Sequence, residues 1–464
     1  MFVPGNELLG GSESRAQSTV ERVMTLSDDD VEASLASLHE RFTSRHEDLR
    51  ASFRRNFDRV ADYVTSPISK SREELLGAMF THEVSLEGAA ICNPSLVASP
   101  RQSGLAEGEV RVVMSYRAIG EGHRSSIAFR EGVIARDGTF ALDALDPFPV
   151  VATVGATLMN RNLFHALLRD QRADGDSAEV VLSSLGDEFS EAQLEDAVAR
   201  LVAQGDTRPN VYRTAQELRS TAAGFYAATF GADISLSRRV LWPAAPDELH
   251  GMEDARFVRL VDEGRARYVA TYTAFNGVSV AQQLLETDDF VSFVSTPLAG
   301  GAARNKGLAV FPRKIDGRFV ALSRYDRESN SIAFTDDLHS WDDAEPLEIS
   351  QLDWEMLQLG NCGAPLELAE GWLVLTHGVG PMRTYAIGAL LLDLKNPAKV
   401  IARLKLPLLT PSAEEQNGYV PNVVYSCGAF LHHDNVCVPY GVGDQSIRYA
   451  TVDLAGLMNA MDAV

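Results

Sequence analysis

Hydrophobic residues recur at helical spacing in the first part of the chain. Between residues 26 and 64, apolar side chains repeat at intervals of three, four and seven, at Leu35, Leu38, Phe42, Leu49, Phe53 and Phe57. Ser27 stands directly before three aspartates, a composition typical of a helix start, where serine caps and acidic residues face the positive end of the dipole. Ser71 and Glu74 have capping-box spacing and predict another helix start. We therefore expect residues 1–84 to form an N-terminal helical extension.

A second helical block is expected at about residues 155–230. It contains SEAQLEDAVARLVAQG, in which Ser190 and Gln193 again have the spacing of a capping box. Strand-like stretches precede and follow this block, so we expect it to be an insertion within a β-domain.

The remaining chain alternates apolar and polar residues with the period of a strand, and the pattern repeats. Five times an apolar strand reaches a Tyr, Ser or His with polar neighbours and a second strand follows: VVMSYRAIGEGHRSSIAF, RYVATYTAFNGVSVAQQLLETDDF, RFVALSRYDRESNSIAFTDDLHSW, GWLVLTHGVGPMRTYAIGALLLDL and NVCVPYGVGDQSIRYATVDL. A closed ring of such units protects the sheet edges and leaves a polar funnel at its axis. The sequence therefore predicts an all-β, five-bladed β-propeller over residues 85–464, with the helical insertion between blades one and two. An all-β sandwich with irregular hairpins is the alternative.

Each repeat also carries polar residues near the ends of its strands. In chain order the five sets are Asn93, Arg117, Glu121 and His123; Glu253, Asp254, Arg256, Tyr272 and Asn276; Lys306, Ser323 and Arg324; Asn361 and His377; and Asn422 and Asp444. Taken singly, each has an ordinary explanation, such as a turn aspartate or a buried histidine. If the units close into a ring, these side chains converge on one pocket. Carboxylates and amides bind sugar hydroxyls and cations hold an oxyanion, so the pocket suits a polyhydroxylated ligand.

Charge and cysteine usage narrow the partners. The formal net charge of −22 disfavours nucleic acid or an anionic membrane as the main partner, although a few local cations can still bind phosphate. The four cysteines form no CxxC pair, which favours free thiols over disulfides or a metal site. No stretch has the roughly 20 apolar residues of a membrane helix. We expect a cytoplasmic protein without a metal.

Several ordered motifs resemble those of glycoside hydrolase family 130, the inverting β-mannoside phosphorylases and related β-mannosidases. They are NPSLV, SYRA, GMEDAR, YTAFNG, NKGLAVFPRKIDGRFVALSR, DDLHSW, GNCGAP, GWLVLTHGV, LLDL, PAKVI, GYVPNVVYSCG and YGVGD, spread over roughly residues 85–460. The resemblance implies a five-bladed β-propeller. It also implies a glycoside phosphorylase that cleaves or forms a β-mannosidic bond with inversion, using phosphate or α-mannose 1-phosphate as co-substrate and no cofactor.

The resemblance also implies roles for individual residues. In the family a blade-one Asp protonates the glycosidic oxygen through a sugar hydroxyl; YRAIGEGHRSS has no Asp, and the role passes to Glu121. Asp254 is grouped with Glu121 as catalytic. Phosphate binding falls to Arg256 and Lys306, joined by Arg324 beside the position of a family His. The expected substrate-binding residues are Asn93, Arg117, Glu253, Tyr272, Asn276, Asn361, His377 and Asp444.

Three other functions remain open at this point. An inverting β-mannosidase would need a carboxylate to activate water, for which Glu286 is available. A mannosyltransferase would take its sugar from a nucleotide-mannose. A non-catalytic glycan-binding propeller would use the same pocket without chemistry. The expected partners are a β-mannoside oligosaccharide, or mannose 1-phosphate with an acceptor, and the extra helices leave a homo-oligomer open.

Overall fold

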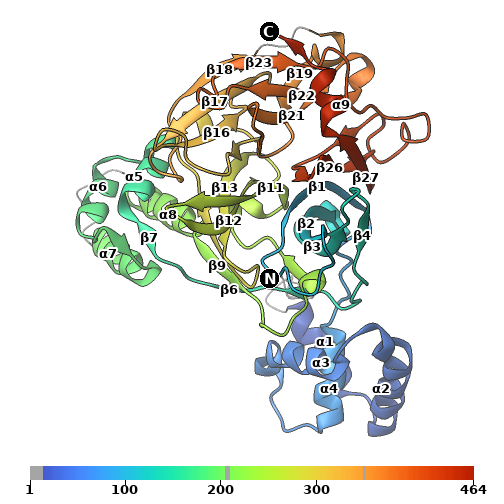
Figure 1. Ribbon diagram of the computed structural model, residues 1–464. Coiled ribbons are helices and arrows are strands. Elements are labelled where there is room, and N and C mark those ends of the chain that lie inside the picture. The colour runs from blue at the N-terminus through green and yellow to red at the C-terminus, as the bar shows by residue number, and fades with distance from the viewer. Residues whose placement is uncertain (1–13, 204–209, 349–351) are drawn as a thin grey trace. The chain divides into compact units, whose positions relative to one another are not determined.

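The computed structural model describes residues 14–203, 210–348 and 352–464 (Figure 1). Its residue contacts separate the chain into two units, Met1–Ser85 and Leu86–Val464. Among the described residues, no helix combines the length and apolar character that crossing a membrane requires.

The first unit is helical. Its α-helices are α1 (Arg15–Met24), α2 (Asp28–Phe42), α3 (Leu49–Asp58) and α4 (Lys70–Met79). The predicted cap of α2 is confirmed, because the Ser27 hydroxyl accepts a hydrogen bond from the Asp30 backbone N–H. The predicted cap at Ser71 is wrong: Ser69 caps α4 by accepting from the Arg72 N–H, and Ser71 already lies inside the helix.

A buried arginine holds three parts of this unit together. Arg72 of α4 donates to the carbonyl oxygens of Val23 at 2.6 Å and Leu26 at 2.9 Å. The same side chain pairs with Asp28 at 2.7 Å. The end of α1 and the start of α2 are thereby tied to α4.

The second unit contains a cluster of helices inserted between strands. These helices are α5 (Arg161–Asp170), α6 (Asp176–Ser183), α7 (Glu191–Ala203) and α8 (Val211–Ala222). The capping box at the start of α7 is confirmed: the Ser190 N–H donates to the Gln193 side chain at 2.8 Å, and the Gln193 N–H donates to the Ser190 hydroxyl. Their apolar faces pack together around Phe164, Phe189 and Leu194.

The rest of the second unit is mostly β-structure. All five predicted hairpins are present as antiparallel pairs: β2 (Val110–Ile119) with β3 (Ser125–Ile134), β12 (Arg265–Phe275) with β13 (Val280–Thr287), β16 (Phe319–Ser323) with β17 (Asn330–Thr335), β21 (Trp372–Val379) with β22 (Tyr385–Leu392), and β26 (Asn435–Val442) with β27 (Ser446–Asp453). A preceding strand pairs with the first strand of each hairpin: β1 (Ala90–Ala98), β11 (Gly251–Asp262), β15 (Ala309–Val310), β19 (Gln358–Asn361) and β24 (Val424–Tyr425).

Other strands extend these groups at their edges. They are β4 (Phe140–Leu142), β14 (Ser292–Pro297), β18 (Ala344–Glu348), β23 (Val400–Arg403), β25 (Phe430–His432) and β28 (Asp462–Ala463). The second group continues through β9 (Tyr226–Thr229) to β6 (Thr153–Gly155), while β10 (Arg239–Leu241) joins β3 to β5 (Val150–Val151). Two short strands, β7 (Met159–Asn160) and β8 (Glu188–Phe189), pair beside the inserted helices.

Hydrogen bonds connect the five groups in a cycle. They run from Ser125 N to His250 O, Val261 N to Pro312 O, Leu359 N to Glu328 O, Tyr385 N to Asn422 O, and Cys427 N to Pro94 O. The last of these joins the fifth group to the first. The first strands of all five groups consequently lie around one centre.

Candidate active site

A cavity of about 270 Å³ opens at this centre and draws residues from all five groups. It is lined by Asn93, Arg117, Asp254, Arg256, Lys306, Gly307, Arg324, Gln358, His377, Arg383, Tyr385, Val423, Tyr425 and Asp444. Eight of the residues expected to meet in one pocket therefore do so. Five of the lining side chains are basic and two are carboxylates, in a chain whose net charge is −22.

Two matching β-bulges aim side chains into the cavity. Strand β1 shifts register between Cys92 and Ser95, and β11 shifts between Glu253 and Arg256. Each bulge holds a non-glycine residue with positive φ, Asn93 at 51° and Asp254 at 58°. A bulge inserts an extra residue and redirects a side chain, and such backbone strain is common at functional sites. The Asn93 amide donates to the Asp254 carboxylate at 2.5 Å, so the two bulges meet.

The Asp254 carboxylate is buried among positive charges. Arg117 Nη1 lies 3.7 Å from Asp254 Oδ1. Burial by itself would raise the pKa of Asp254, but the charges of Arg117, Lys306 and Arg256 hold that pKa below its usual value. Asp254 is thus ionised near neutral pH.

The second carboxylate in the lining behaves differently. Burial raises the pKa of Asp444, and the negative charge of Asp254 raises it further. Glu253 lies behind the lining with 6% of its surface exposed and pairs with Arg117 at 2.7 Å and Lys306 at 3.4 Å. Glu253 therefore positions two lining cations and does not itself line the cavity.

Arg256 presents a partly satisfied guanidinium. Its Nη1 donates to the backbone oxygen of Asp254 at 2.9 Å, and its Nη2 donates to the Tyr425 hydroxyl at 2.8 Å. A guanidinium has five N–H donors in a planar fork, so donors remain for an anion.

Arg324 is held by a neutral histidine. Burial, followed by the charges of Arg324 and Arg256, keeps the pKa of His377 well below its usual value. His377 Nδ1 lies 3.1 Å from the Asn361 carbonyl oxygen, which fixes the proton on Nδ1. His377 Nε2 then accepts from Arg324 Nη1 at 2.8 Å. A neutral acceptor orients the guanidinium without cancelling its charge.

Glu121 and Asn276 lie outside the cavity lining. Glu121 is exposed, in the short turn Glu121–His123 that follows β2. Asn276 closes the turn between β12 and β13, where its amide oxygen accepts from the Ser279 backbone N–H at 2.8 Å. Both side chains sit at the strand ends where the sequence places them, but on the turns instead of the inner strands.

Tyr272 and Asn361 point into protein. The Tyr272 hydroxyl donates to Glu248 and lies 2.8 Å from the Ser295 hydroxyl, in the fully buried core of the second group. Asn361 donates to the Gly307 carbonyl oxygen at 2.6 Å and thereby supports the loop that carries Lys306. Their polar groups are satisfied inside the protein, which is why they do not reach the cavity.

Four polar side chains in the lining were not expected from the sequence. Tyr425 and Tyr385 come from strands, Gln358 begins β19, and Arg383 stands in the turn before β22. The tyrosines lie in apolar runs that read as core. Arg383 has a φ of 55°, a left-handed backbone conformation that is unusual for arginine and that no local sequence feature predicts.

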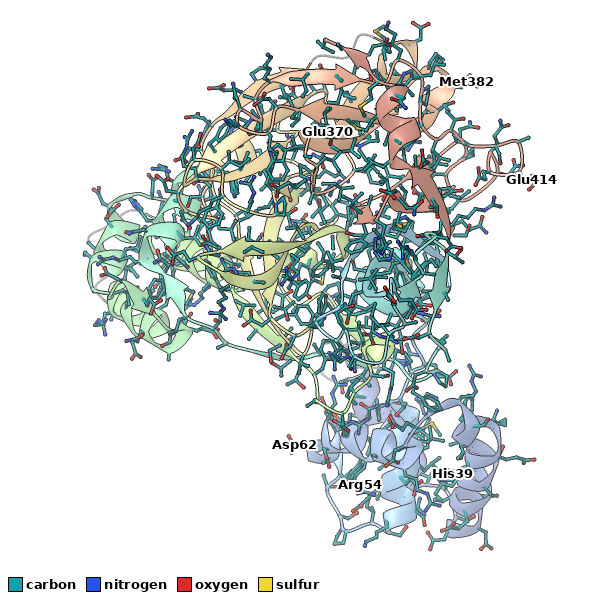
Figure 2. All side chains as sticks on the ribbon, viewed as in Figure 1. His39, Arg54, Asp62, Glu370, Met382 and Glu414 are labelled. Carbon is teal, nitrogen blue, oxygen red and sulfur yellow. The ribbon has the colours of Figure 1, made fainter. Side chains whose placement is uncertain are left out.

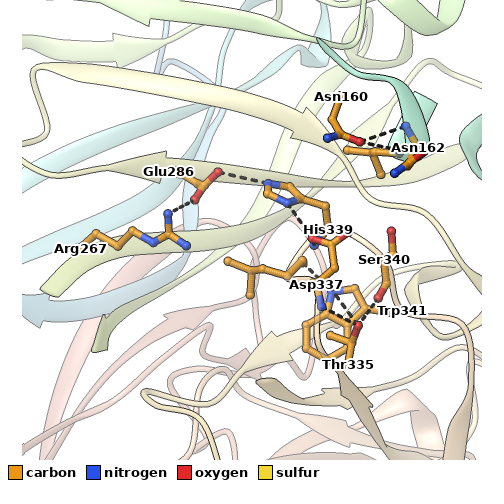
Figure 3. Close-up of polar contacts among 11 residues, drawn as sticks. Asn160, Asn162, Arg267, Glu286, Thr335, Asp337, His339, Ser340 and Trp341 are labelled. Atoms are coloured by element: carbon orange, nitrogen blue, oxygen red, sulfur yellow. Dashed lines mark hydrogen bonds and ion pairs between the residues drawn. The ribbon is translucent and has the colours of Figure 1, made fainter. Parts of the chain in front are cut away.

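Glu286, the candidate base of a hydrolase, forms ion pairs with Arg267 and His339 away from the cavity (Figure 3). Its carboxylate lies 2.9 Å from Arg267 Nη1 and 3.2 Å from His339 Nε2. His339 Nδ1 in turn lies 3.2 Å from Asp337. Glu286 is not among the residues that line the cavity.

Comparisons with known proteins point to one family. The family model described as beta-1,4-mannooligosaccharide phosphorylase matches residues 211–463, more than half of the chain. A 1,2-beta-oligomannan phosphorylase of Thermoanaerobacter sp. (strain X514) is 34% identical over 230 residues, covering 47% of this chain and 74% of that protein. A beta-1,2-mannobiose phosphorylase of Listeria innocua is 32% identical over 231 residues, covering 48% and 63%.

A solved structure is also similar. It is the beta-1,2-mannobiose phosphorylase of Listeria innocua in complex with beta-1,2-mannobiose, 24% identical, covering 80% of this chain and 92% of that one with a TM-score of 0.47. The extent of the family match, together with the identity to the Thermoanaerobacter relative over most of its length, settles the family. The chain belongs to glycoside hydrolase family 130.

Proposed function

We propose that this protein is an inverting phosphorylase that converts a β-mannoside and inorganic phosphate into α-mannose 1-phosphate and a free sugar. One observation carries the proposal: Arg256, Lys306 and Arg324 line the same small cavity as Asp254 and Asp444. Cations for an oxyanion and carboxylates for sugar hydroxyls are the two requirements of this reaction. The two relatives described above, an oligomannan phosphorylase and a mannobiose phosphorylase, agree with it.

The fold supports a propeller. Five antiparallel groups, joined in a cycle by hydrogen bonds around a polar cavity, support a five-bladed β-propeller. We assign the helices of the first unit as an N-terminal extension. The helices α5 to α8 then form an insertion between blades one and two.

Phosphate would bind at the cationic wall of the cavity, which consists of Arg256, Lys306 and Arg324. Arg256 and Arg324 offer guanidinium donors in fixed orientations, and Lys306, with 40% of its side chain exposed, adds a mobile charge. Water as nucleophile would need a base there, and these cations cannot serve as one. The wall therefore favours phosphorolysis over hydrolysis.

Asp254 is our candidate proton donor. Glu121 is exposed and lies outside the lining, so the acid is sought among the lining carboxyls. Arg117, Lys306 and Arg256 hold the Asp254 pKa down, and the last two are cations that phosphate would bind. A phosphate dianion would offset their charge, raise the Asp254 pKa and allow this group to carry a proton when the nucleophile is present.

The Asp254 carboxyl gives its proton, directly or through a sugar hydroxyl, to the glycosidic oxygen as the bond from C1 to that oxygen breaks. A phosphate oxygen forms the new bond to C1 from the opposite face, which inverts the β-configuration to α. The leaving sugar departs as an alcohol. Asp254 then takes up a proton from the solvent, to which mannose 1-phosphate releases its own. Inorganic phosphate is a co-substrate, and no cofactor takes part.

Asn93, Arg117 and Asp444 would hold the mannosyl unit. Asn93 and Arg117 already contact Asp254, so they also orient the proposed acid. The raised pKa of Asp444 suits a group that exchanges hydrogen bonds with sugar hydroxyls.

The test is to incubate the protein with β-1,2- and β-1,4-mannobiose, each with and without inorganic phosphate, and to quantify mannose 1-phosphate and free mannose. We expect equal amounts of mannose 1-phosphate and mannose, and only when phosphate is present. Two mannoses per disaccharide at a rate independent of phosphate would replace this proposal with hydrolysis. A K306A variant should raise the phosphate KM, whereas K314A, whose lysine pairs with Asp262 at 3.1 Å, is the matched control.

A further inference from the structure

Two turns of the second unit share an unusual backbone. The turn Glu121–His123 follows Gly120 with φ −108° and ψ −157°, and the turn Pro381–Arg383 follows Gly380 with φ −112° and ψ −162°. Each then places two successive residues at positive φ, Gly122 and His123 in the first turn and Met382 and Arg383 in the second. Non-glycine residues rarely adopt this conformation, and where it persists it often serves a function.

Both turns follow strands that carry residues of the cavity. The first connects the strand that carries Arg117 to β3, and the second connects the strand that carries His377 to β22. Arg383 of the second turn lines the cavity, and Met382 beside it is 86% exposed (Figure 2). The second turn therefore forms part of the rim around the opening, and the first turn begins four residues after Arg117.

An aromatic pair joins the first turn to the segment that precedes Val423. The His123 ring stacks on Tyr419 with centroids 5.8 Å apart and an interplanar angle of 26°. Tyr419 is nevertheless 59% exposed, so the stack covers only part of the ring. An exposed tyrosine braced by a second ring is a flat, rigid surface of the kind that binds apolar faces of ligands.

Backbone hydrogen bonds hold Tyr419 next to the cavity. The Val420 N–H donates to the Gly443 carbonyl oxygen at 2.8 Å, and the Gly443 N–H donates to the Val423 carbonyl oxygen at 2.8 Å. Val423 and Asp444 both line the cavity. Tyr419 thus directly precedes a segment, residues 420–423, whose backbone is hydrogen-bonded to Gly443 beside the cavity.

The size of the cavity leaves a substrate partly outside it. Drug-sized ligands occupy pockets of roughly 300–1,000 Å³. A cavity of about 270 Å³ is below that range and must hold both a mannosyl unit and phosphate. The second sugar of a disaccharide then extends to the rim.

We propose that Tyr419, braced by His123, is the platform for the sugar unit on the leaving-group side of the scissile bond. This inference deepens the proposed function and rests on it for the identity of the sugar. The ring packs against a C–H face of that sugar. Arg383 donates to hydroxyl oxygens from one side, and the exposed carboxylate of Glu121 accepts from hydroxyls on the other. Glu121 thereby contributes to recognition of the acceptor and not to proton transfer.

Calorimetry with mannose, β-1,2-mannobiose and β-1,4-mannobiose tests the platform without requiring turnover. We expect Y419A to weaken disaccharide binding about tenfold, the equivalent of roughly 1.4 kcal/mol, and to leave mannose binding unchanged. Y419F keeps the ring and should bind the disaccharide like the unmodified protein. Y212A is the matched control, because Tyr212 is 77% exposed on α8 among the inserted helices.

A kinetic measurement separates this inference from the proposed function. In the direction of synthesis from mannose 1-phosphate, Y419A should raise the acceptor KM about tenfold with the mannose 1-phosphate KM unchanged. Unchanged disaccharide affinity in Y419A would overturn the platform even if the protein is a phosphorylase. Loss of disaccharide affinity in a protein that releases no phosphate from mannose 1-phosphate would retain the platform and reject the phosphorylase.

Discussion

Two groups of charged side chains in the second unit differ in how completely they are paired. The Glu286 cluster, made of Arg267, Glu286, Asp337 and His339, alternates positive and negative groups at 2.9 to 3.2 Å (Figure 3). The cavity cluster, made of the charged side chains that line the cavity, has five cations and two carboxylates. Burying an unpaired charge is costly, so an excess of one sign around a cavity needs another explanation.

The balance of charge distinguishes a ligand-binding site from a structural ion network. The Glu286 cluster satisfies its own charges and lines none of the cavity described above. In the cavity cluster Arg324 meets a neutral His377, which orients it without neutralising it. Unbalanced charge beside open space points to a charged ligand, whereas balanced charge points to stability.

The largest effect should come from Asp254. A D254N variant keeps the size of the side chain and its contact with Asn93 but removes the proposed acid. We expect kcat for phosphorolysis of mannobiose to fall about a thousandfold, in the range typical of general acid catalysis. Disaccharide affinity measured by calorimetry should change much less.

Two companion variants make this result specific. D444N removes the other lining carboxyl and should act mainly on KM, because its role is to bind hydroxyls. E121Q should retain kcat within about twofold, since the exposed Glu121 touches no reacting atom in the proposed mechanism. If E121Q were as inactive as D254N, the proton donor would instead be Glu121.

A smaller effect is expected at the cationic wall. R324A removes one phosphate donor and the guanidinium that donates to His377 Nε2. We expect the phosphate KM to rise about tenfold, the usual worth of one charge-assisted hydrogen bond, with little change in the mannobiose KM. R313A is the control, because Arg313 pairs with Glu367 at 2.7 Å and lies outside this cavity. Equal phosphate KM values for R324A and the unmodified protein would show that the excess charge has another purpose.

Much of the fold follows from local sequence. The alternation of apolar residues specifies all five hairpins, because each pairs residues that are close in the chain. The helix start at Ser27 and the capping box at Ser190 are equally local. The wrong prediction at Ser71 also has a local cause. Ser69 lies only two residues earlier and is an equally good N-cap, so residue propensity alone does not choose between the two serines.

The residues of the site can be predicted only in part from local sequence. Polar residues at strand ends identified eight lining residues, including Asp254 and Arg256. The bulges that aim Asn93 and Asp254 require positive φ in non-glycine residues, for which the sequence has no signal. Tyr272 turns away because its partner Glu248 lies far along the chain, and such long-range satisfaction is visible only in three dimensions.

The Glu286 cluster supplies the last prediction, which concerns stability instead of activity. Burial would lower the pKa of His339, but its hydrogen bonds to Asp337 and Glu286 outweigh burial and raise that pKa to about 9. An unfolded histidine titrates near pH 6.5. The folded pKa is the higher one, so the stabilisation is fully present below about pH 6.5 and is lost as the pH rises to about 9. Its size is on the order of 1–3 kcal/mol, reduced from the full shift because the side chains are partly exposed.

An H339Q variant should remove this pH dependence. The difference in free energy of unfolding between the unmodified protein and H339Q, measured by urea denaturation, should be largest near pH 6 and shrink toward zero above about pH 9. Glutamine keeps hydrogen-bonding capacity without the charge, so the change isolates the ionic contribution. Phosphorolysis should stay within about twofold of the unmodified rate, because this cluster contributes no side chain to the cavity. A large loss of activity in H339Q at unchanged stability would mean that the two clusters are coupled, and that complete pairing of buried charge does not identify a purely structural network.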